Sequence, residues 1–231
     1  MCFSAEASFI AAAILAPAGM AVLWRAYKTD WRLVPVAALP LLFGAQQALE
    51  GGIWSVDDDA HLAAQLSLAY MFFSWLAWPV WTSFSLYFLE PVPRKPLFVI
   101  FAILGGIFGG AQYFPYFVHA DWLAVKYLGY AISYGEIELF DYILGRSVTY
   151  TLYVALIIGP LLLSSHKHIR IFGLLVFAVL IITYVFFAYA YISVFCFGGA
   201  LMSLYLVWMI FSGNLRLPGA ATVNGKIAAL A

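Results

Sequence analysis

Seven apolar segments, most of them long enough for one membrane crossing, constrain the fold of this chain more than any other feature. A helix needs about 20 apolar residues to cross the hydrocarbon core of a bilayer. Of the 231 residues 65% are hydrophobic and 10% are charged, whereas a soluble domain carries about 25% charged residues. The sequence therefore predicts an all-α, polytopic membrane bundle. Its helices are expected at residues 5–24, 33–54, 62–89, 96–118, 148–163, 169–192 and 194–211.

The distribution of lysine and arginine predicts the orientation of this bundle. Seven crossings would place nine of the 11 basic residues on one side, and basic loops stay in the cytoplasm. The N-terminus is therefore expected outside and the C-terminus in the cytoplasm. The nine residues are Arg25, Lys28, Arg32, Arg94, Lys95, Lys167, Arg170, Arg216 and Lys226.

The polar parts of the chain complete the domain organisation. Segment 119–146 is too polar to cross a membrane, so we expect an extracytoplasmic cap that is partly helical from Asp121. The alternation around residues 130–139 would also suit a short hairpin. Residues 1–212 are expected to form one membrane domain, and residues 213–231 a flexible cytoplasmic tail. A net charge of zero, without a basic patch, gives no indication of nucleic-acid binding.

Glu50 is the residue in the apolar segments that most strongly suggests a site. A charge in the bilayer core costs from about 2.5 to more than 10 kcal/mol, so a carboxyl group there needs a partner or a polar cavity. Gln46 and Gln47 lie four and three residues earlier, on the same helical face. Glu50 is either a ligand, base or proton carrier in a cavity, or a protonated group that holds two helices together.

Aromatic residues beside Glu50 extend this candidate site. Trp54 follows Glu50 by four residues, and Tyr70 and Trp78 belong to a polar-aromatic stripe on the next helix. Such a stripe could line a pocket for a small lipophilic ligand, or it could be ordinary packing. The predicted ligand-binding residues are Glu50, Gln46, Gln47, Trp54, Trp78 and Tyr70.

Cys2 and Cys196 are the two cysteines, and the predicted topology places both at the outer face. Three interpretations stay open: a disulfide in an oxidising compartment, two separate buried thiols, or a metal-binding or catalytic pair. None of the four histidines lies within a predicted helix, so no metal site is assigned.

Four glycines in the helix at 96–118 predict a close packing surface. They form two pairs with four-residue spacing, which lets helix backbones approach each other. The partner is either a neighbouring helix of the same chain or a second protein. The glycines are Gly105, Gly106, Gly109 and Gly110.

Several motifs together resemble those of one family. The chain begins MCFSAEASF, continues with LPLLFGAQQALEGGIW and WPVW, and ends its apolar part with SVFCFGGALMS. It is similar over about residues 1–212 to a family of uncharacterised bacterial integral membrane proteins, whose members begin MCFSA-x-ASF and carry QQ-x-x-EG. The resemblance implies a seven-span protein of the bacterial inner membrane and implies no activity or cofactor. The motif positions are Cys2, Phe3, Ser4, Gln46, Gln47, Glu50 and Cys196.

Three functions therefore remain open. The first is binding, sensing or carrying a small or lipophilic ligand in an outer-half cavity around Glu50. The second is an enzyme at the membrane surface, with Cys2 or Cys196 as nucleophile or metal ligand and Glu50 as general base. The third is a structural subunit of a membrane complex that docks through the glycine surface.

Overall fold

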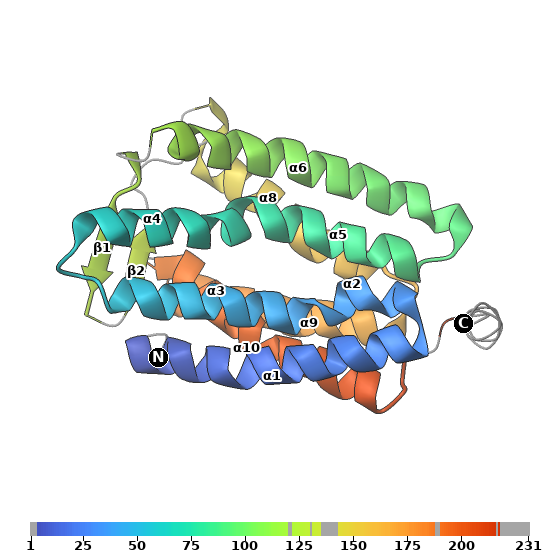
Figure 1. The fold of residues 1–231 in the computed structure, drawn as a ribbon. Coiled ribbons are helices and arrows are strands. Elements are labelled where there is room, and N and C mark those ends of the chain that lie inside the picture. The colour runs from blue at the N-terminus through green and yellow to red at the C-terminus, as the bar shows by residue number, and fades with distance from the viewer. Residues whose placement is uncertain are drawn as a thin grey trace.

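A bundle of seven helical rods makes up most of the structure (Figure 1). The structure is a computed structural model that describes residues 4–119, 122–129, 131–134, 143–187, 190–215 and 217. Chain neighbours run in opposite directions, and the first helical rod starts at one end of the bundle while the last one finishes at the other. The rods are α1 (Ala5–Thr29), α2 with α3 (Val34–Ala37, Leu39–Trp54), α4 with α5 (Ala60–Met71, Trp78–Leu89), α6 (Lys95–Val118), α8 (Arg146–Leu163), α9 (Lys167–Phe186) and α10 (Tyr191–Phe211).

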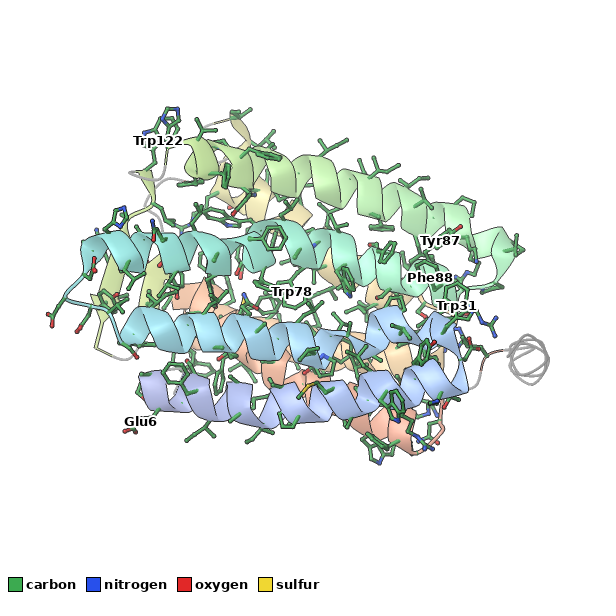
Figure 2. All side chains as sticks on the ribbon, viewed as in Figure 1. Glu6, Trp31, Trp78, Tyr87, Phe88 and Trp122 are labelled. Atoms are coloured by element: carbon green, nitrogen blue, oxygen red, sulfur yellow. The ribbon has the colours of Figure 1, made fainter. Side chains whose placement is uncertain are left out.

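Six of the rods in the described residues are long and apolar enough to cross a membrane. Their outward faces carry large apolar side chains, such as Ile103 and Ile107 of α6, which are 57% and 66% exposed. Such a surface is unfavourable in water and favourable against lipid. Aromatic side chains gather at the ends of the bundle, with Trp31 and Tyr87 at one end and Trp122 at the other (Figure 2). The chain is therefore a multi-pass membrane protein.

The remaining rod is interrupted where α4 meets α5. Residues Phe72–Ala77 form a π-helical turn, which divides the rod into two α-helices of 12 residues each. Pro79 follows this turn and has no backbone N–H to donate to the carbonyl of Trp75. The turn also releases the carbonyl of Ser74, which accepts a hydrogen bond from the Tyr153 hydroxyl of α8. π-Helical turns are rare and often lie at functional sites.

The glycines of α6 pack mainly inside the molecule. Gly105 lies directly against the carbonyl of Pro79, and Gly109 against the carbonyl of Trp75. The same helix turns Gly106 toward the Val80 side chain, where a methyl group would make an ordinary contact of 3.7 Å. The glycine surface was predicted to pack either against a helix of the same chain or against a second protein. Gly105 and Gly109 pack within the chain, so they are not available to another protein.

A β-hairpin occupies the described part of the predicted cap. Strands β1 (Val125–Leu128) and β2 (Ala131–Tyr134) pair antiparallel, with Val125 opposite Tyr134. The expectation of a helix is therefore wrong for these residues, and the hairpin starts earlier than suggested, so that β2 falls within residues 130–139 and β1 before them. Alternating aromatic and β-branched residues with Gly129 in the turn favour strands. Residues 135–142 lie outside the described part of the chain, as does Asp121.

Two further boundaries differ from the sequence prediction. Helix α9 ends at Phe186, so Tyr191 and Ile192 belong to α10 rather than to the preceding helix. Hydropathy missed this break because the residues on both sides of it are apolar. The tail prediction is only partly covered, because residues 216 and 218–231 lie outside the described residues, while Leu215 and Leu217 are buried against the core.

Asp30 joins α1 to the second rod and is almost completely buried. One oxygen accepts from the backbone N–H of Arg32 at 3.0 Å, and the other lies 2.6 Å from the Arg32 guanidinium. Burial by itself would raise the pKa of Asp30. The hydrogen bonds and charge of Arg32 outweigh it and hold the pKa below the usual value of 3.8.

The variant Asp30→Asn is expected to lower stability in a pH-dependent way. Asparagine keeps the capping geometry but loses the charge, which contributes about 1–3 kcal/mol in a charged hydrogen bond. Because the native pKa is depressed, this contribution is present above the usual pKa of aspartate and is lost as the pH falls through the native value. Thermal unfolding in detergent at neutral and acidic pH measures the difference. An equal difference in unfolding temperature between wild type and variant at both pH values would contradict a stabilising charge on Asp30.

Gly109→Ala is expected to destabilise the bundle by about 1–3 kcal/mol, because its methyl group would overlap the carbonyl of Trp75. The matched control is Gly106→Ala, three residues earlier on the same helix, where alanine should be neutral or stabilise by up to about 1 kcal/mol. Thermal unfolding of the purified variants compares the two. Equal effects at both glycines would show that α6 does not pack closely against the π-helical turn.

Candidate functional site

Glu50 lies in the interior of the bundle on α3, with 0% of its surface exposed. Gln47, one turn earlier, donates its side-chain amide to Oε2 of Glu50 at 3.1 Å. The hydroxyl of Ser193 on α10 donates to Oε1. The ion pairs in the described residues are Arg32 with Asp30 and Arg94 with Glu90, so neither involves Glu50. The carboxyl group is therefore held by neutral donors alone.

Gln46 belongs to a second hydrogen-bond network, next to the one formed by Gln47, Glu50 and Ser193. Its amide nitrogen donates to Ser74 Oγ at 3.0 Å, and its amide oxygen accepts from the Trp78 indole at 3.0 Å. Ser74 Oγ also lies 3.4 Å from Sγ of Cys196 on α10. Trp78 stacks on Phe43, with ring centroids 4.1 Å apart, and Figure 2 shows it between α3 and α5. This second network joins α3, the π-helical turn and α10 to one another.

Tyr70 connects these two hydrogen-bond networks to the hairpin. It is fully buried, and its hydroxyl faces the Glu50 carboxyl and the Cys196 sulfur without reaching the geometry of a regular hydrogen bond. Its ring stacks on Tyr134 of β2, with centroids 4.8 Å apart. We call the following residues the polar cluster: Gln46, Gln47, Glu50, Tyr70, Ser74, Trp78, Ser193 and Cys196.

Most of the sequence-predicted site residues meet in this cluster, with Trp54 as the exception. Trp54 lies one turn nearer the hairpin end of α3 and approaches Tyr127 of β1, with centroids 5.8 Å apart. The sequence analysis missed Ser193, although its position three residues before Cys196 places both on one face of α10. Cys196 is a free, buried cysteine, and Cys2 lies outside the described residues, so the three interpretations of the two cysteines stay open. No group of three or more metal-ligating side chains occurs among the described residues.

Two pockets adjoin the polar cluster and meet at Phe195 and Cys196. Both are narrow, with room for about one or two water molecules each. Glu50 lines neither pocket. Cys196 lines both pockets, and Ser74 lines the first of them. The first, which we call the polar pocket, includes Ser74, Gln112, Thr149, Tyr150 and Tyr153. The second, the apolar pocket, includes Phe43, Trp78, Ile157, Phe172 and Val176.

Glu90 is a second buried acid, at the opposite end of the bundle from the hairpin. Its Oε1 accepts from the Ser164 hydroxyl at 2.5 Å and from the Ser165 backbone N–H at 2.8 Å. Arg94 lies 3.8 Å from its Oε2. These bonds tie the end of α5 to the turn between α8 and α9. Hydropathy did not single out Glu90, because it follows the apolar segment instead of interrupting it.

The fold and the buried polar cluster define a class, the multi-pass helical membrane protein with a hydrogen-bonded polar interior. The chain belongs to a family of unknown function, DUF6629, which matches residues 1–221. The resemblance noted in the sequence, to an uncharacterised family, agrees with this assignment. No curated protein and no solved structure matches the chain.

Ser193→Ala is expected to lower the free energy of unfolding by about 1–3 kcal/mol, because Oε1 of the buried Glu50 loses its donor. Ser203→Ala is the matched control, since Ser203 is also buried on α10 but donates only to the carbonyl of Ala200 in its own helix. Thermal unfolding in detergent compares the variants. A loss at Ser203 as large as the loss at Ser193 would contradict a specific bond between α3 and α10.

Proposed function

We propose that this protein binds a small, neutral, lipophilic molecule inside the bundle. The observation that supports this most directly is the junction of the polar pocket and the apolar pocket at Phe195 and Cys196. Ligand sites in helical bundles lie between helices and combine apolar walls with a few placed polar groups. This function belongs to the binding, sensing or carrying class.

The lining of the two pockets selects the chemistry of the ligand. Hydroxyl and amide groups of Thr149, Tyr150 and Gln112 offer donors and acceptors to a polar head, while the apolar pocket suits a hydrocarbon or aromatic tail. No charged side chain is among the described residues that line either pocket. An ionic head would therefore lack a counter-charge, so we propose a neutral head such as an alcohol or a carbonyl group.

Glu50 acts in this proposal as a positioning residue. Through Ser193 it fixes the first turn of α10, and the next turn of that helix carries Phe195 and Cys196. The enzyme alternative has less support, because it needs Glu50 and a sulfur at one shared open point, and Glu50 lines neither pocket. The accessory-subunit alternative has less support, because Gly105 and Gly109 already pack within the chain.

We propose that α4 and α5 together form the seventh crossing, since residues Ala60–Leu89 make one continuous rod. An odd number of crossings agrees with the start of α1 and the end of α10 lying at opposite ends of the bundle (Figure 1). The basic residues then place the C-terminus in the cytoplasm and the polar cluster in the outer half of the bacterial inner membrane. The hairpin would cover this outer end.

Val176→Phe is expected to reduce ligand retention about tenfold, because the larger ring fills the apolar pocket at a cost of about 1.4 kcal/mol or more. The matched control is Val185→Phe, on the same helix but 62% exposed on the outward face. Protein purified in mild detergent is extracted with organic solvent, and the neutral lipophilic compounds are quantified by mass spectrometry. Equal retention by both variants, or no compound above a detergent blank, would refute the proposed site.

A further inference from the structure

Several buried polar atoms around Glu50 lack a hydrogen-bond partner among the described residues. Gln47 uses its amide nitrogen to hold Glu50, but its amide oxygen is unpaired. Tyr70 faces the carboxyl group with an unpaired hydroxyl, and Ser67 precedes it by three residues on the same face of α4. All three side chains are fully buried.

Two more unpaired atoms belong to α3 and to α1, the helix that packs against it. Trp54 follows Glu50 by one turn on α3, and its indole N–H is unpaired. The hydroxyl of Ser8 on α1 is also unpaired, and its neighbour Phe9 packs against Gly51, the residue after Glu50. Buried polar groups without a protein partner are costly in a dry interior and are normally satisfied by ordered water. The unpaired oxygens of Gln47 and Tyr70, which lie beside the Glu50 carboxyl group, are therefore places where ordered water would bind.

In the part of the chain that the structure describes, the groups that face Glu50 provide no positive charge. Tyr70 of α4 and Cys196 of α10 are the titratable side chains that face it, and Tyr134 of β2 lies behind Tyr70. Within the described residues of α1 and α2, no titratable side chain faces it. An unpaired carboxylate in the membrane interior is strongly disfavoured relative to a neutral acid.

We propose that Glu50 is a proton-binding site of the membrane interior, a neutral carboxylic acid whose proton exchanges through water held on Gln47, Ser67 and Tyr70. The carboxyl group can donate its proton to such a water molecule while the Ser193 hydroxyl donates to Oε1. It keeps the amide of Gln47 as a donor to its other oxygen. This assignment is independent of the ligand proposed above, because Glu50 lines neither pocket.

The hairpin lies where it would limit access to this site. Tyr134 of β2 stacks on Tyr70, and Tyr127 of β1 donates its hydroxyl to the carbonyl of Ile53 at 2.9 Å. Both contacts lie at the end of the bundle where α3 and α4 meet the loop that contains Asp57 and Asp58 (Figure 1). Proton exchange would therefore occur with the side of the membrane that this loop faces.

Infrared spectroscopy of the full-length protein in liposomes tests this proposal. The wild type should show the carbonyl stretch of a protonated carboxylic acid at neutral pH, and Glu50→Gln should remove it. The band should move to lower frequency when H₂O is replaced by D₂O, because water reaches the proton. The matched control is Glu90→Gln, which removes an acid paired with Arg94 and should leave the band unchanged.

The result that would overturn the proposal is a neutral-pH spectrum in which Glu50→Gln removes a carboxylate band and no acid band. An acid band that does not respond to D₂O would overturn the access of water. If Glu50→Gln does not fold, Glu50→Asp provides the second variant. It keeps an acid at the position and should displace the same band, whereas an unchanged band would refute the assignment to Glu50.

Discussion

The absence of water from the bilayer core is the constraint on which this structure depends. Every polar group between the helices must find a partner within the protein, because lipid offers none. The polar cluster meets this requirement for most of its groups by joining α3, α10 and the π-helical turn through Glu50, Gln46 and Ser74. The amide oxygen of Gln47 and the hydroxyl of Tyr70 have no partner among the described residues. Apolar side chains cover the outside of the same helices. The cluster therefore fixes which faces of these helices turn inward, a choice that hydrophobicity alone cannot make between equally apolar faces.

Close backbone contact supports this arrangement from the outside of the cluster. Gly109 lies against the carbonyl of Trp75, within the π-helical turn that also carries Ser74. A side chain at Gly109 would push that turn away from α6, and Ser74 would move with it. The hydroxyl of Tyr153 on α8 donates a hydrogen bond to the carbonyl of Ser74, which the turn leaves without a partner in its own helix. The irregular backbone is thus paired with protein groups, which is the condition under which a membrane helix tolerates such a break.

The sequence was sufficient for the helices and for the centre of the cluster, and it failed where long-range packing decides. Glu50, Gln46 and Gln47 could be grouped because spacing along one helix determines a shared face. Ser193 could not be chosen as the partner of Glu50, since no local pattern distinguishes it from other serines in apolar helices. The suggested hairpin range contained β2 but missed β1, because the strands are specified by contacts such as Tyr134 on Tyr70. The start of α10 was also misplaced, because hydropathy does not change across that break.

The two buried acids show how different partners lead to different chemistry. Glu90 receives a backbone N–H and a hydroxyl and lies near Arg94, so its negative charge is compensated at the end of the bundle. Glu50 receives one amide and one hydroxyl, and the atoms around it that lack partners are neutral. Glu90 therefore has a positively charged neighbour, whereas the described hydrogen-bond partners of Glu50 are neutral. The bonds of Glu90 hold the end of α5 against the turn between α8 and α9. The neutral partners of Glu50 are the reason for proposing proton exchange there, because a carboxyl group without a positive partner in the bilayer core is favoured as the neutral acid.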